Sequence, residues 1–461
     1  MKLSIVGLGK LGAPMAAVMA EKGHRVIGVD LNPGFVNAIN QGRAPVNEPG
    51  LSELIQKNRD RLSATTDFNQ AVANSEITFI IVPTPSEDDG AFSLRFVLGA
   101  GEAVGQALRA KHGYHVVVLS STVMPGSTQG SLLPVLERAS GKCAGADFGL
   151  CYNPEFIALG SVIHDMLNPD MVLIGEYDQR SGDMLEKLHR GVCESNPTIA
   201  RMNFVNAELT KLSVNTFVTT KISYANMLAQ VCETLPGADV AVVTRAIGAD
   251  SRIGTRYLKG ALGYGGPCFP RDNVAFSTLA RRNGVPASLA EATDALNRRQ
   301  VPRLAEMVLG RLPANGTAGV AGLSYKPETE VIEESQGLLL AKELLSRDVR
   351  VVVYDPAAME NARSALVGRV GFAKSLMDCA MQSDVLTIAT PWKEFGSLTA
   401  EAMHAGNGRQ KTVIDCWRIL KRENFEPLVN YLTLGLGAAS QTVEASSPQP
   451  LIKAQVQARG D

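Results

Sequence analysis

The sequence lacks four features that would each place it in a broad class of proteins. It has no apolar run as long as a transmembrane helix, and its first apolar run turns into glycines, unlike a signal peptide. Its formal net charge is only −1 and its basic residues are dispersed, which argues against nucleic acid and membrane surfaces as partners. Its seven cysteines form no CxxC pair, so neither a disulfide framework nor a zinc site is indicated. We therefore expect a cytoplasmic protein without a bound metal.

The first half of the chain alternates between strand-like and helix-like segments. The chain has 461 residues, of which 45% are hydrophobic, enough to fill the cores of two or three domains. A helix is expected from about Pro14 to Lys22, and further helical stretches separate the later apolar runs. The strand-like runs are residues 3–7, 24–30, 77–83, 114–120 and 171–175. This alternation is typical of a doubly wound parallel sheet.

The second half repeats that architecture after a long helical segment. Residues 206–235 contain neither glycine nor proline and predict one long helix, which we expect to join two domains and support a dimer interface. Strand-like runs then return at 317–325, 349–356, 384–391 and 412–417. The predicted fold class is therefore α/β, with two Rossmann-like doubly wound domains joined by a long central helix, although no clear sequence repeat relates them.

A glycine-rich turn follows the first predicted strand. Gly7, Gly9 and Gly12 form a GxGxxG motif between this strand and a helix. The first glycine permits a tight turn, the second lets the backbone approach a pyrophosphate, and the third lets helix and strand pack closely. Asp30 ends the second strand, where a carboxylate binds a ribose 2′-hydroxyl and repels a 2′-phosphate. The motif predicts NAD rather than NADP as cofactor.

Two further loops follow strands of the same predicted sheet. They are residues 82–86, with Pro83 and Thr84, and residues 120–128, with Thr122. Loops at the carboxyl ends of parallel strands line the ligand crevice, so we take Pro83 and Thr84 as cofactor contacts. The prolines are equally compatible with a role as simple turn formers.

Cys268 lies in a loop rich in glycine. The segment 260–272 holds four glycines and this cysteine, and such a loop lets backbone pass close to a ligand. A thiolate attacks an aldehyde readily and gives a thiohemiacetal that can be oxidised. The alternative is a buried, inert cysteine, which is the common fate of a free cysteine.

Four more side chains could serve the same chemistry. Lys211 and Asn215 lie four residues apart on the long helix, so both project from one face and could stabilise an oxyanion. Glu155 follows a turn and Asp272 stands four residues after the cysteine, and each could accept a proton. A solvated helix face, a surface charge and a helix cap are the respective alternatives.

Several ordered motifs resemble those of the UDP-glucose/GDP-mannose dehydrogenase family. The resemblance covers about residues 1 to 420. The matching motifs are GLGKLGAP (7–14), NEPGL (47–51), STVMPGST (121–128), NPEF (153–156), AELTK (207–211) with Asn215, RIGTRYLKGALGYGGPCFPRD (252–272) and GLSYKPETE (322–330).

The resemblance implies a division of the chain into functional parts. It implies an NAD-binding Rossmann-like domain over residues 1–200 and a central helical dimerisation domain over 201–300. A UDP-sugar-binding α/β domain would cover 301–437. The polar Ser/Gln/Ala-rich stretch 438–461 is expected to be a disordered tail.

The resemblance also implies a four-electron oxidation of a sugar C6 alcohol to a carboxylate. Two hydrides would pass to NAD in succession, and Cys268 would hold the aldehyde as a thiohemiacetal and then as a thioester. Lys211 and Asn215 would hold the developing oxyanion. The residues that position or activate water would be Thr122, Glu155 and Asp272.

Substrate contacts follow from the same resemblance. Lys326, Phe156 and Gly265 would contact the nucleotide sugar, and Arg252 would reach it from the neighbouring subunit of a homodimer. Arg252 stands sixteen residues before Cys268, as in the UDP-glucose branch. We therefore favour a UDP-hexose, with glucose first, over a UDP-N-acetylhexosamine or GDP-mannose.

Four positions depart from the family pattern. Leu159 replaces a usual glutamate and Glu333 a usual arginine, which looks like a coupled change because the two lie together at the cofactor in relatives. Met171 and Trp417 replace two further arginines, and Arg418 follows the second. The departures bear on nicotinamide contact, cofactor affinity and recognition of the base, and leave the cysteine chemistry untouched.

Two functions of other kinds stay open at this level. A two-electron hydroxyacid-type dehydrogenase shares the NAD domain, a helical middle and a catalytic lysine, but needs no cysteine. A non-catalytic nucleotide-sugar-binding protein would tolerate the four departures, yet would have no need of the reactive side chains.

Overall fold

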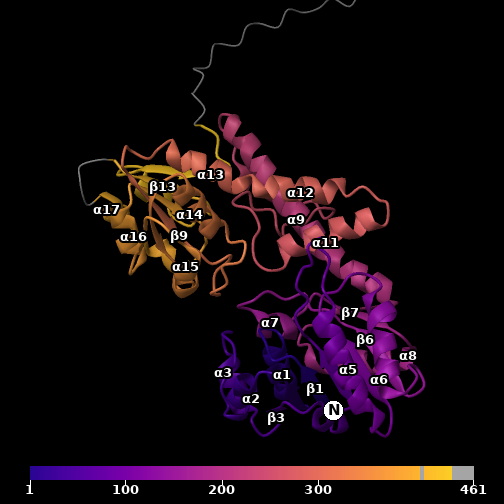
Figure 1. Ribbon diagram of the computed structural model, residues 1–461. Helices are drawn as coiled ribbons and strands as arrows, with labels where there is room; N and C mark the ends of the chain where they lie inside the picture. The colour runs from indigo at the N-terminus through magenta and orange to yellow at the C-terminus, as the bar shows by residue number, and fades with distance from the viewer. Residues whose placement is uncertain (405–409, 439–461) are drawn as a thin grey trace, which may run out of the picture.

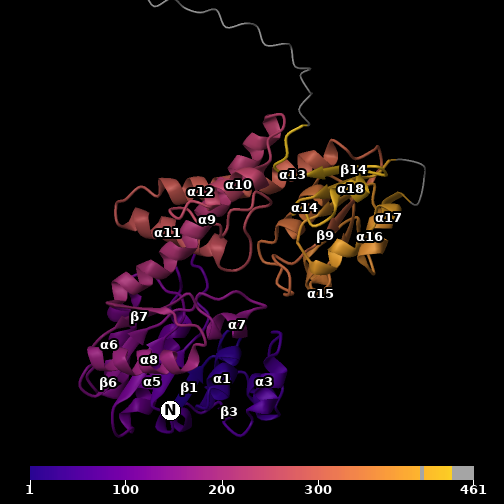
Figure 2. The same ribbon diagram turned by 180° about the vertical axis from the view of Figure 1, so that it is seen from behind.

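The computed structural model describes residues 1–404 and 410–438. Two α/β parts lie at opposite ends of the molecule and a long helix, α9, runs between them (Figure 1). The same arrangement, seen from behind in Figure 2, places the helices α10 to α12 around α9. The predicted fold class is confirmed.

The N-terminal part is built on one eight-stranded sheet. The strand order is β3-β2-β1-β4-β5-β6-β7-β8, and all neighbours are parallel except β6 and β7. The strands are β1 (Lys2–Val6), β2 (Arg25–Val29), β3 (Leu62–Thr65), β4 (Ile77–Ile80), β5 (His115–Leu119), β6 (Phe148–Tyr152), β7 (Met171–Glu176) and β8 (Thr198–Met202). A parallel sheet places the carboxyl ends of β1, β4 and β5 along one edge, where ligands bind.

Helices cover both faces of this sheet and bury its apolar strands. One core lies under α1, α3, α7 and α8, and a second lies under α4, α5 and α6. The helices are α1 (Gly12–Glu21), α2 (Pro33–Asn40), α3 (Leu51–Lys57), α4 (Phe68–Ala73), α5 (Arg95–Arg109), η1 (Thr128–Leu132), α6 (Leu133–Ser140), α7 (Val162–Leu167) and α8 (Gln179–Val192).

The central helix α9 (Phe204–Thr234) has 31 residues and agrees with the expected helix over 206–235. It begins where the side chain of Asn203 accepts a hydrogen bond from the Asn206 amide, and Pro236 follows its end. The helices packed around it are α10 (Val240–Gly248), α11 (Phe269–Arg282), α12 (Ser288–Arg298) and α13 (Gln300–Leu309). The loop with Cys268 enters α11.

The C-terminal part has a second, six-stranded parallel sheet in the order β11-β10-β9-β12-β13-β14. Its strands are β9 (Thr317–Ala321), β10 (Arg350–Tyr354), β11 (Val370–Phe372), β12 (Val385–Ile388), β13 (Thr412–Asp415) and β14 (Asn430–Thr433). Its helices are α14 (Gln336–Ser346), α15 (Met359–Ala365), α16 (Leu376–Gln382), η2 (Lys393–Ser397), α17 (Ala400–His404) and α18 (Arg422–Phe425).

Each strand expected from an apolar run is present, although several end before the run does. β4 stops at Ile80 while its run continues to Pro83, because the chain leaves the sheet to form a ligand-side loop. The strands not predicted are β3, β8, β11 and β14, which are short or partly exposed, and β6, which is fully buried. Of the expected tail, only Ala438 lies within the described residues, where its carbonyl accepts a hydrogen bond from Gly237.

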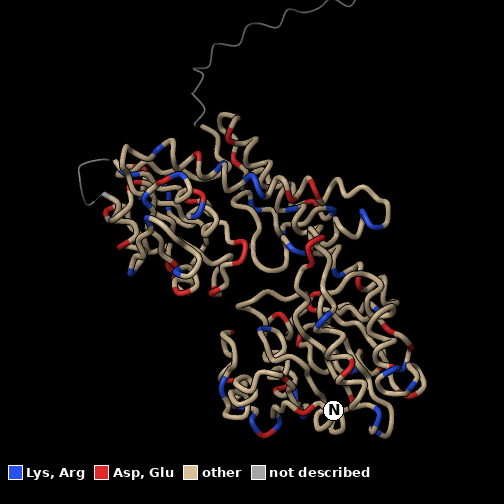
Figure 3. The backbone as a smooth tube through the Cα atoms, in the orientation of Figure 1, with Lys and Arg blue, Asp and Glu red and all other residues tan. Residues whose placement is uncertain are grey.

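Charged residues of both signs are interspersed along the backbone of all parts (Figure 3). No helix among the described residues combines the length and apolarity needed to cross a bilayer. All seven cysteines are free thiols.

Candidate active site

The glycines of the first loop have the three expected steric environments. Gly7 has φ +97°, and a Cβ there would overlap the carbonyl oxygen of Ile81 on β4. A Cβ at Gly12 would overlap the carbonyl oxygen of Gly7, so this glycine lets α1 pack on the loop. Nothing lies within 4 Å of a Cβ built at Gly9, which leaves the backbone open to a ligand.

Asp30 follows β2 and faces the same loop. One carboxylate oxygen accepts a hydrogen bond from the Leu8 amide at 2.7 Å, and the other accepts one from the Asn32 amide at 2.8 Å. The side chain is only half-buried, so lone pairs remain for ribose hydroxyls. A steric cradle for the pyrophosphate and an open acceptor for a ribose together fit NAD.

The loops after β4 and β5 meet beside this cradle. The hydroxyl of Thr84 donates a hydrogen bond to the carbonyl of Thr122 at 2.8 Å. The neighbouring Pro83 is exposed to solvent. Both loops leave the carboxyl ends of their strands, as expected. The contact brings Thr122 next to the predicted cofactor residues.

One face of α9 carries Glu208, Lys211 and Asn215, all of them buried. Lys211 is only 7% exposed, so the alternative of a solvated helix face is wrong. Its ammonium donates to the carbonyl of Glu155 at 2.6 Å and lies 4.5 Å from the centre of the Phe156 ring. Burial lowers the pKa of the Lys211 ammonium, against the charges of Asp272, Cys268 and Glu155.

Asn215 and Asp272 form a buried pair across α9 and α11. The amide of Asn215 donates to a carboxylate oxygen of Asp272 at 2.6 Å, and Arg271 contacts the other oxygen at 3.2 Å. The N-cap position of α11 is occupied by Cys268, not by Asp272. The carboxylate of Asp272 instead joins α11 to α9 through Asn215, and the alternative of a helix cap is wrong.

Cys268 is exposed, while Cys151, Cys232, Cys379 and Cys416 are buried. The alternative of an inert core cysteine therefore applies to those four and not to Cys268. Partial burial of its thiol and the Asp272 carboxylate raise the pKa of Cys268, while Arg271 and Lys211 oppose that shift. The thiol thus faces two cations that stabilise a negative charge and one carboxylate able to hold a proton.

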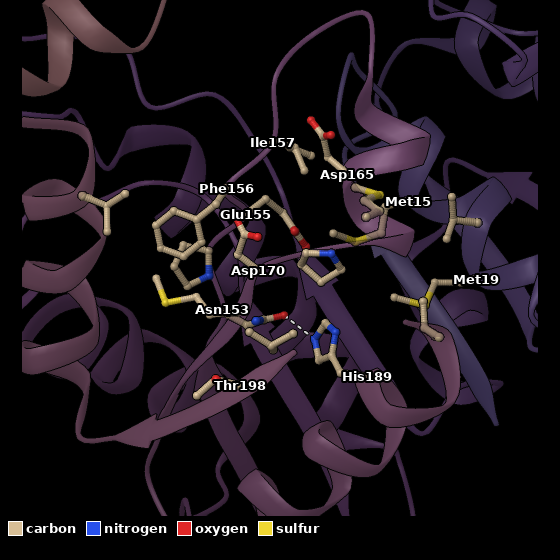
Figure 4. Close-up of a pocket in the computed structure, with 18 residues that line it drawn as sticks. Met15, Met19, Asn153, Glu155, Phe156, Ile157, Asp165, Asp170, His189 and Thr198 are labelled. Carbon is tan, nitrogen blue, oxygen red and sulfur yellow. Dashed lines mark hydrogen bonds between the residues drawn. The ribbon is translucent and has the colours of Figure 1, made fainter. Parts of the chain in front are cut away.

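Glu155 lines a cavity of about 540 Å³ in the N-terminal part. Figure 4 shows Glu155 and Phe156 above His189. The Nε2 atom of His189 forms a hydrogen bond of 2.8 Å with the side-chain oxygen of Asn153. The walls are mostly apolar, and burial raises the pKa of Glu155 to about 7. Glu155 is thus no plain surface charge, because its carbonyl holds Lys211 while its carboxyl titrates near neutrality.

The predicted substrate residues lie in different surroundings. Burial lowers the pKa of Lys326, and the charges of Asp165 and Glu48 in the N-terminal part oppose this shift. A Cβ at Gly265 would overlap the Glu334 carbonyl, so the cysteine loop packs against the C-terminal part. Arg252 is exposed and pairs with Asp250 at 2.6 Å.

The four departures from the family pattern have separate structural settings. Leu159 packs on the apolar core of the N-terminal part, and Met171 lines the cavity beside Glu155. Glu333 lines a cleft of about 1020 Å³ next to the cysteine loop, and its charge is among the causes that raise the pKa of Cys268. The indole of Trp417 donates to the Ala389 carbonyl at 2.8 Å.

Two buried carboxylates that organise the site were not identified from the sequence. Glu208 accepts hydrogen bonds from the amides of Gly126 and Thr128, at 2.5 and 2.8 Å, and so ties the Thr122 loop to α9. Glu48 accepts from Gly160 and Val162 and so fixes the start of α7. Both residues lie in motifs already noted in the sequence, AELTK and NEPGL. The backbone amides that their carboxylates bind belong to distant segments, so the sequence did not reveal these hydrogen bonds.

The fold and the glycine loop with Asp30 together define an NAD-dependent oxidoreductase. Models of the UDP-glucose/GDP-mannose dehydrogenase family match in three consecutive segments: the NAD binding domain at residues 1–193, the central domain at 205–299 and the UDP binding domain at 319–422. The chain belongs to this family.

Individual relatives agree with this assignment. The chain is 38% identical to a UDP-glucose 6-dehydrogenase of Haloferax volcanii, over 93% of this chain and all of the relative. It is 34% identical to a GDP-mannose 6-dehydrogenase of Pseudomonas aeruginosa, over 77% and 81% of the two chains. A UDP-glucose dehydrogenase structure from Pyrobaculum islandicum superposes with a TM-score of 0.84 at 35% identity, covering 94% and 96%.

Proposed function

We propose that the enzyme oxidises the C6 alcohol of a nucleotide sugar to the carboxylate, converting UDP-glucose to UDP-glucuronate. The observation that carries the proposal is the exposed thiol of Cys268 beside the buried Lys211, Asn215 and Asp272. NAD, when bound on the Gly7–Gly12 loop, accepts a hydride in each of two oxidations.

The side chains have distinct tasks in this scheme. Lys211 and Asn215 stabilise the alkoxide as the alcohol loses its proton, which passes through water to Asp272. The Cys268 thiolate then adds to the aldehyde carbon, and the thiohemiacetal is oxidised to a thioester. Water, positioned by Thr122 and Glu155, attacks the thioester and releases the carboxylate and the thiol. The balance is one alcohol, one water and two NAD consumed, against one carboxylate, two NADH and three protons formed.

The proposed UDP-sugar rests on Arg252, Lys326 and the relatives named above. Because some relatives are GDP-mannose dehydrogenases, the main question for the substrate assay is whether the nucleotide base is uracil or guanine. We keep the division into an NAD-binding part (1–200), a dimerisation part (201–300) and a UDP-sugar-binding part (301–437). The free cysteines fit the expected cytoplasmic location.

The test is an oxidation assay with UDP-glucose, two UDP-N-acetylhexosamines and GDP-mannose as separate substrates. Two NADH per sugar and a uronate mass are expected with UDP-glucose. One NADH per sugar would indicate a two-electron dehydrogenase, and binding of UDP-glucose without NADH formation would indicate a non-catalytic protein. Cys268→Ser should form no carboxylate while it still binds NAD.

We also propose a homodimer that pairs through α9. Large apolar side chains are exposed along this helix, and a groove of about 890 Å³ runs beside them. Those on the helix are Val205, Leu209, Phe217, Tyr224, Met227 and Val231. The exposed Arg252 would then reach the site of the partner.

Sedimentation velocity tests the dimer with two matched variants. Phe217→Glu places a charge on the proposed interface and should give monomers, whereas Val367→Glu, at an 86% exposed position of the C-terminal part, should not. A dimeric Phe217→Glu protein would contradict the proposal.

A further inference from the structure

The two sheets repeat one another in strand order and in register. The order β3-β2-β1-β4-β5-β6 of the first sheet corresponds to β11-β10-β9-β12-β13-β14 of the second. β1 and β4 pair at Leu3 and Ile77, and the equivalent strands β9 and β12 pair at Ala318 and Val385, one residue into the first strand in both cases. The C-terminal part is therefore a second dinucleotide-type unit, in agreement with the two Rossmann-like domains expected from the sequence, although no clear sequence repeat relates them.

The steric signature of the dinucleotide loop is repeated as well. Gly322 follows β9 with φ +100°, as Gly7 follows β1 with φ +97°. A Cβ at Gly337 would overlap the carbonyl oxygen of Gly322, just as one at Gly12 would overlap that of Gly7. In the second unit, α14 therefore packs closely on the turn after β9, as α1 packs on the turn after β1.

The acidic residue after the second strand is repeated too, but its surroundings differ. Asp355 accepts a hydrogen bond from the Leu323 amide at 2.7 Å, the same distance as that between Asp30 and the Leu8 amide. Asp355 is 1% exposed, whereas Asp30 is half-buried. Only Asp30 keeps lone pairs for a ribose.

Side-chain donors fill the place of the ribose beside Asp355. The same carboxylate oxygen accepts from the amide and the hydroxyl of Ser324, both at 2.9 Å, and from the indole of Trp392 at 3.2 Å. The indole also donates to the Ser324 hydroxyl at 3.1 Å. Trp392 stands four residues after the end of β12, as Thr84 stands four residues after the end of β4. The second unit therefore has a bulky indole donor where the first unit has a small hydroxyl donor.

The loop between the two glycines is also much longer in the second unit. Four residues separate Gly7 from Gly12, and fourteen separate Gly322 from Gly337. The longer loop fills the region that a pyrophosphate occupies in a dinucleotide unit. It carries Tyr325, whose ring would be 2.6 Å from a Cβ at Gly266, and the adjacent Lys326. Gly266 is two residues from Cys268.

We propose that Asp355, Ser324 and Trp392 are positioning residues that hold the 323–336 loop in the former dinucleotide site. They thereby fix Tyr325 and Lys326 against the cysteine loop, and the chain binds one NAD although it contains two dinucleotide-type units. The expected effect on binding of the nucleotide sugar rests on the function proposed above, whereas the anchoring of the 323–336 loop does not depend on it.

The test compares Trp392→Phe and Ser324→Ala with Asp30→Asn. The first two remove one donor to Asp355, and each should raise KM for UDP-glucose about fivefold to tenfold with KM for NAD unchanged. Asp30→Asn should raise KM for NAD and leave that for UDP-glucose unchanged. Equilibrium dialysis of the wild type should give one NAD per chain. Two NAD per chain would overturn the proposal.

A second measurement does not depend on the substrate. Iodoacetamide labelling of Cys268, resolved by peptide mass, should be about fivefold faster in Trp392→Phe and Ser324→Ala, because Tyr325 no longer holds the loop firmly. Folded variants with unchanged labelling and unchanged KM for UDP-glucose would overturn the proposal. If the wild type fails to oxidise UDP-glucose, the proposed function fails, and the labelling rates alone decide on the anchor. If the Trp392→Phe protein does not fold, Ser324→Ala provides the same test, because it removes a smaller side-chain group.

Discussion

Replacement of Lys211 by methionine removes one positive charge at the centre of the site and keeps the length of the side chain. The ammonium donates to the Glu155 carbonyl at 2.6 Å and faces Cys268 and Asp272. If it stabilises the oxyanion, its loss should lower kcat by about 10² to 10³, equivalent to about 3 to 4 kcal/mol. The thiol of Cys268 should also become harder to ionise, because Lys211 is one of two cations that lower its pKa.

Stability should change far less than activity in this variant. A buried ammonium is costly to desolvate, so an apolar replacement favours folding, while the Glu155 carbonyl loses its donor. The two effects oppose each other, and we expect the free energy of unfolding to change by less than about 2 kcal/mol. The assays are initial rates of NADH formation and urea unfolding.

Lys111→Met is the matched control for Lys211→Met. Its ammonium is partly buried and donates to the carbonyls of Val72 and Ser75, which precede β4 at the amino-terminal edge of the sheet, opposite the edge with the Thr84 and Thr122 loops. This control should keep its kcat. A Lys211→Met enzyme with kcat within about threefold of the wild type would refute the oxyanion role, since one such donor contributes about 10² or more.

Three further variants test other groups. The pKa of Glu155 is about 7 in the folded protein against an ordinary 4.5, so its stabilising contribution is complete below pH 4.5 and is lost as pH rises through about 7. Glu155→Gln should therefore remove up to about 3 kcal/mol of pH dependence from urea unfolding between pH 5 and 8, and an unchanged slope would contradict this. Glu208→Gln should lower the free energy of unfolding by about 2 to 3 kcal/mol in the same assay, because two backbone amides lose a charged acceptor. Asp272→Asn should lower kcat by about 10² or more, and a normal rate of NADH formation would exclude it as the proton acceptor.

The sequence predicted those parts of the fold that depend on local pattern. Buried parallel strands are apolar on both faces, so β1, β5 and β12 are visible as continuous runs. β3 and β11 were missed because they are short and partly exposed. The long helix was visible because no glycine or proline interrupts it.

The same contrast holds within the site. The four-residue spacing of Lys211 and Asn215 predicted one shared helix face, and both side chains are buried there. The role of Glu208 could not be predicted, because its partners stand some eighty residues earlier in the chain. Nor could the difference between Asp30 and Asp355, since both follow a strand in similar sequence surroundings.

Local sequence by itself determined the class of fold, the glycine turn with its acidic partner, and the order of the family motifs, because these depend on neighbouring residues and on short-range geometry. Tertiary structure alone decided which cysteine is exposed, which lysine is buried, and which of two equivalent aspartates stays open to a ligand. Burial and charge are properties of surroundings built from distant segments, and those surroundings set the chemistry of each side chain.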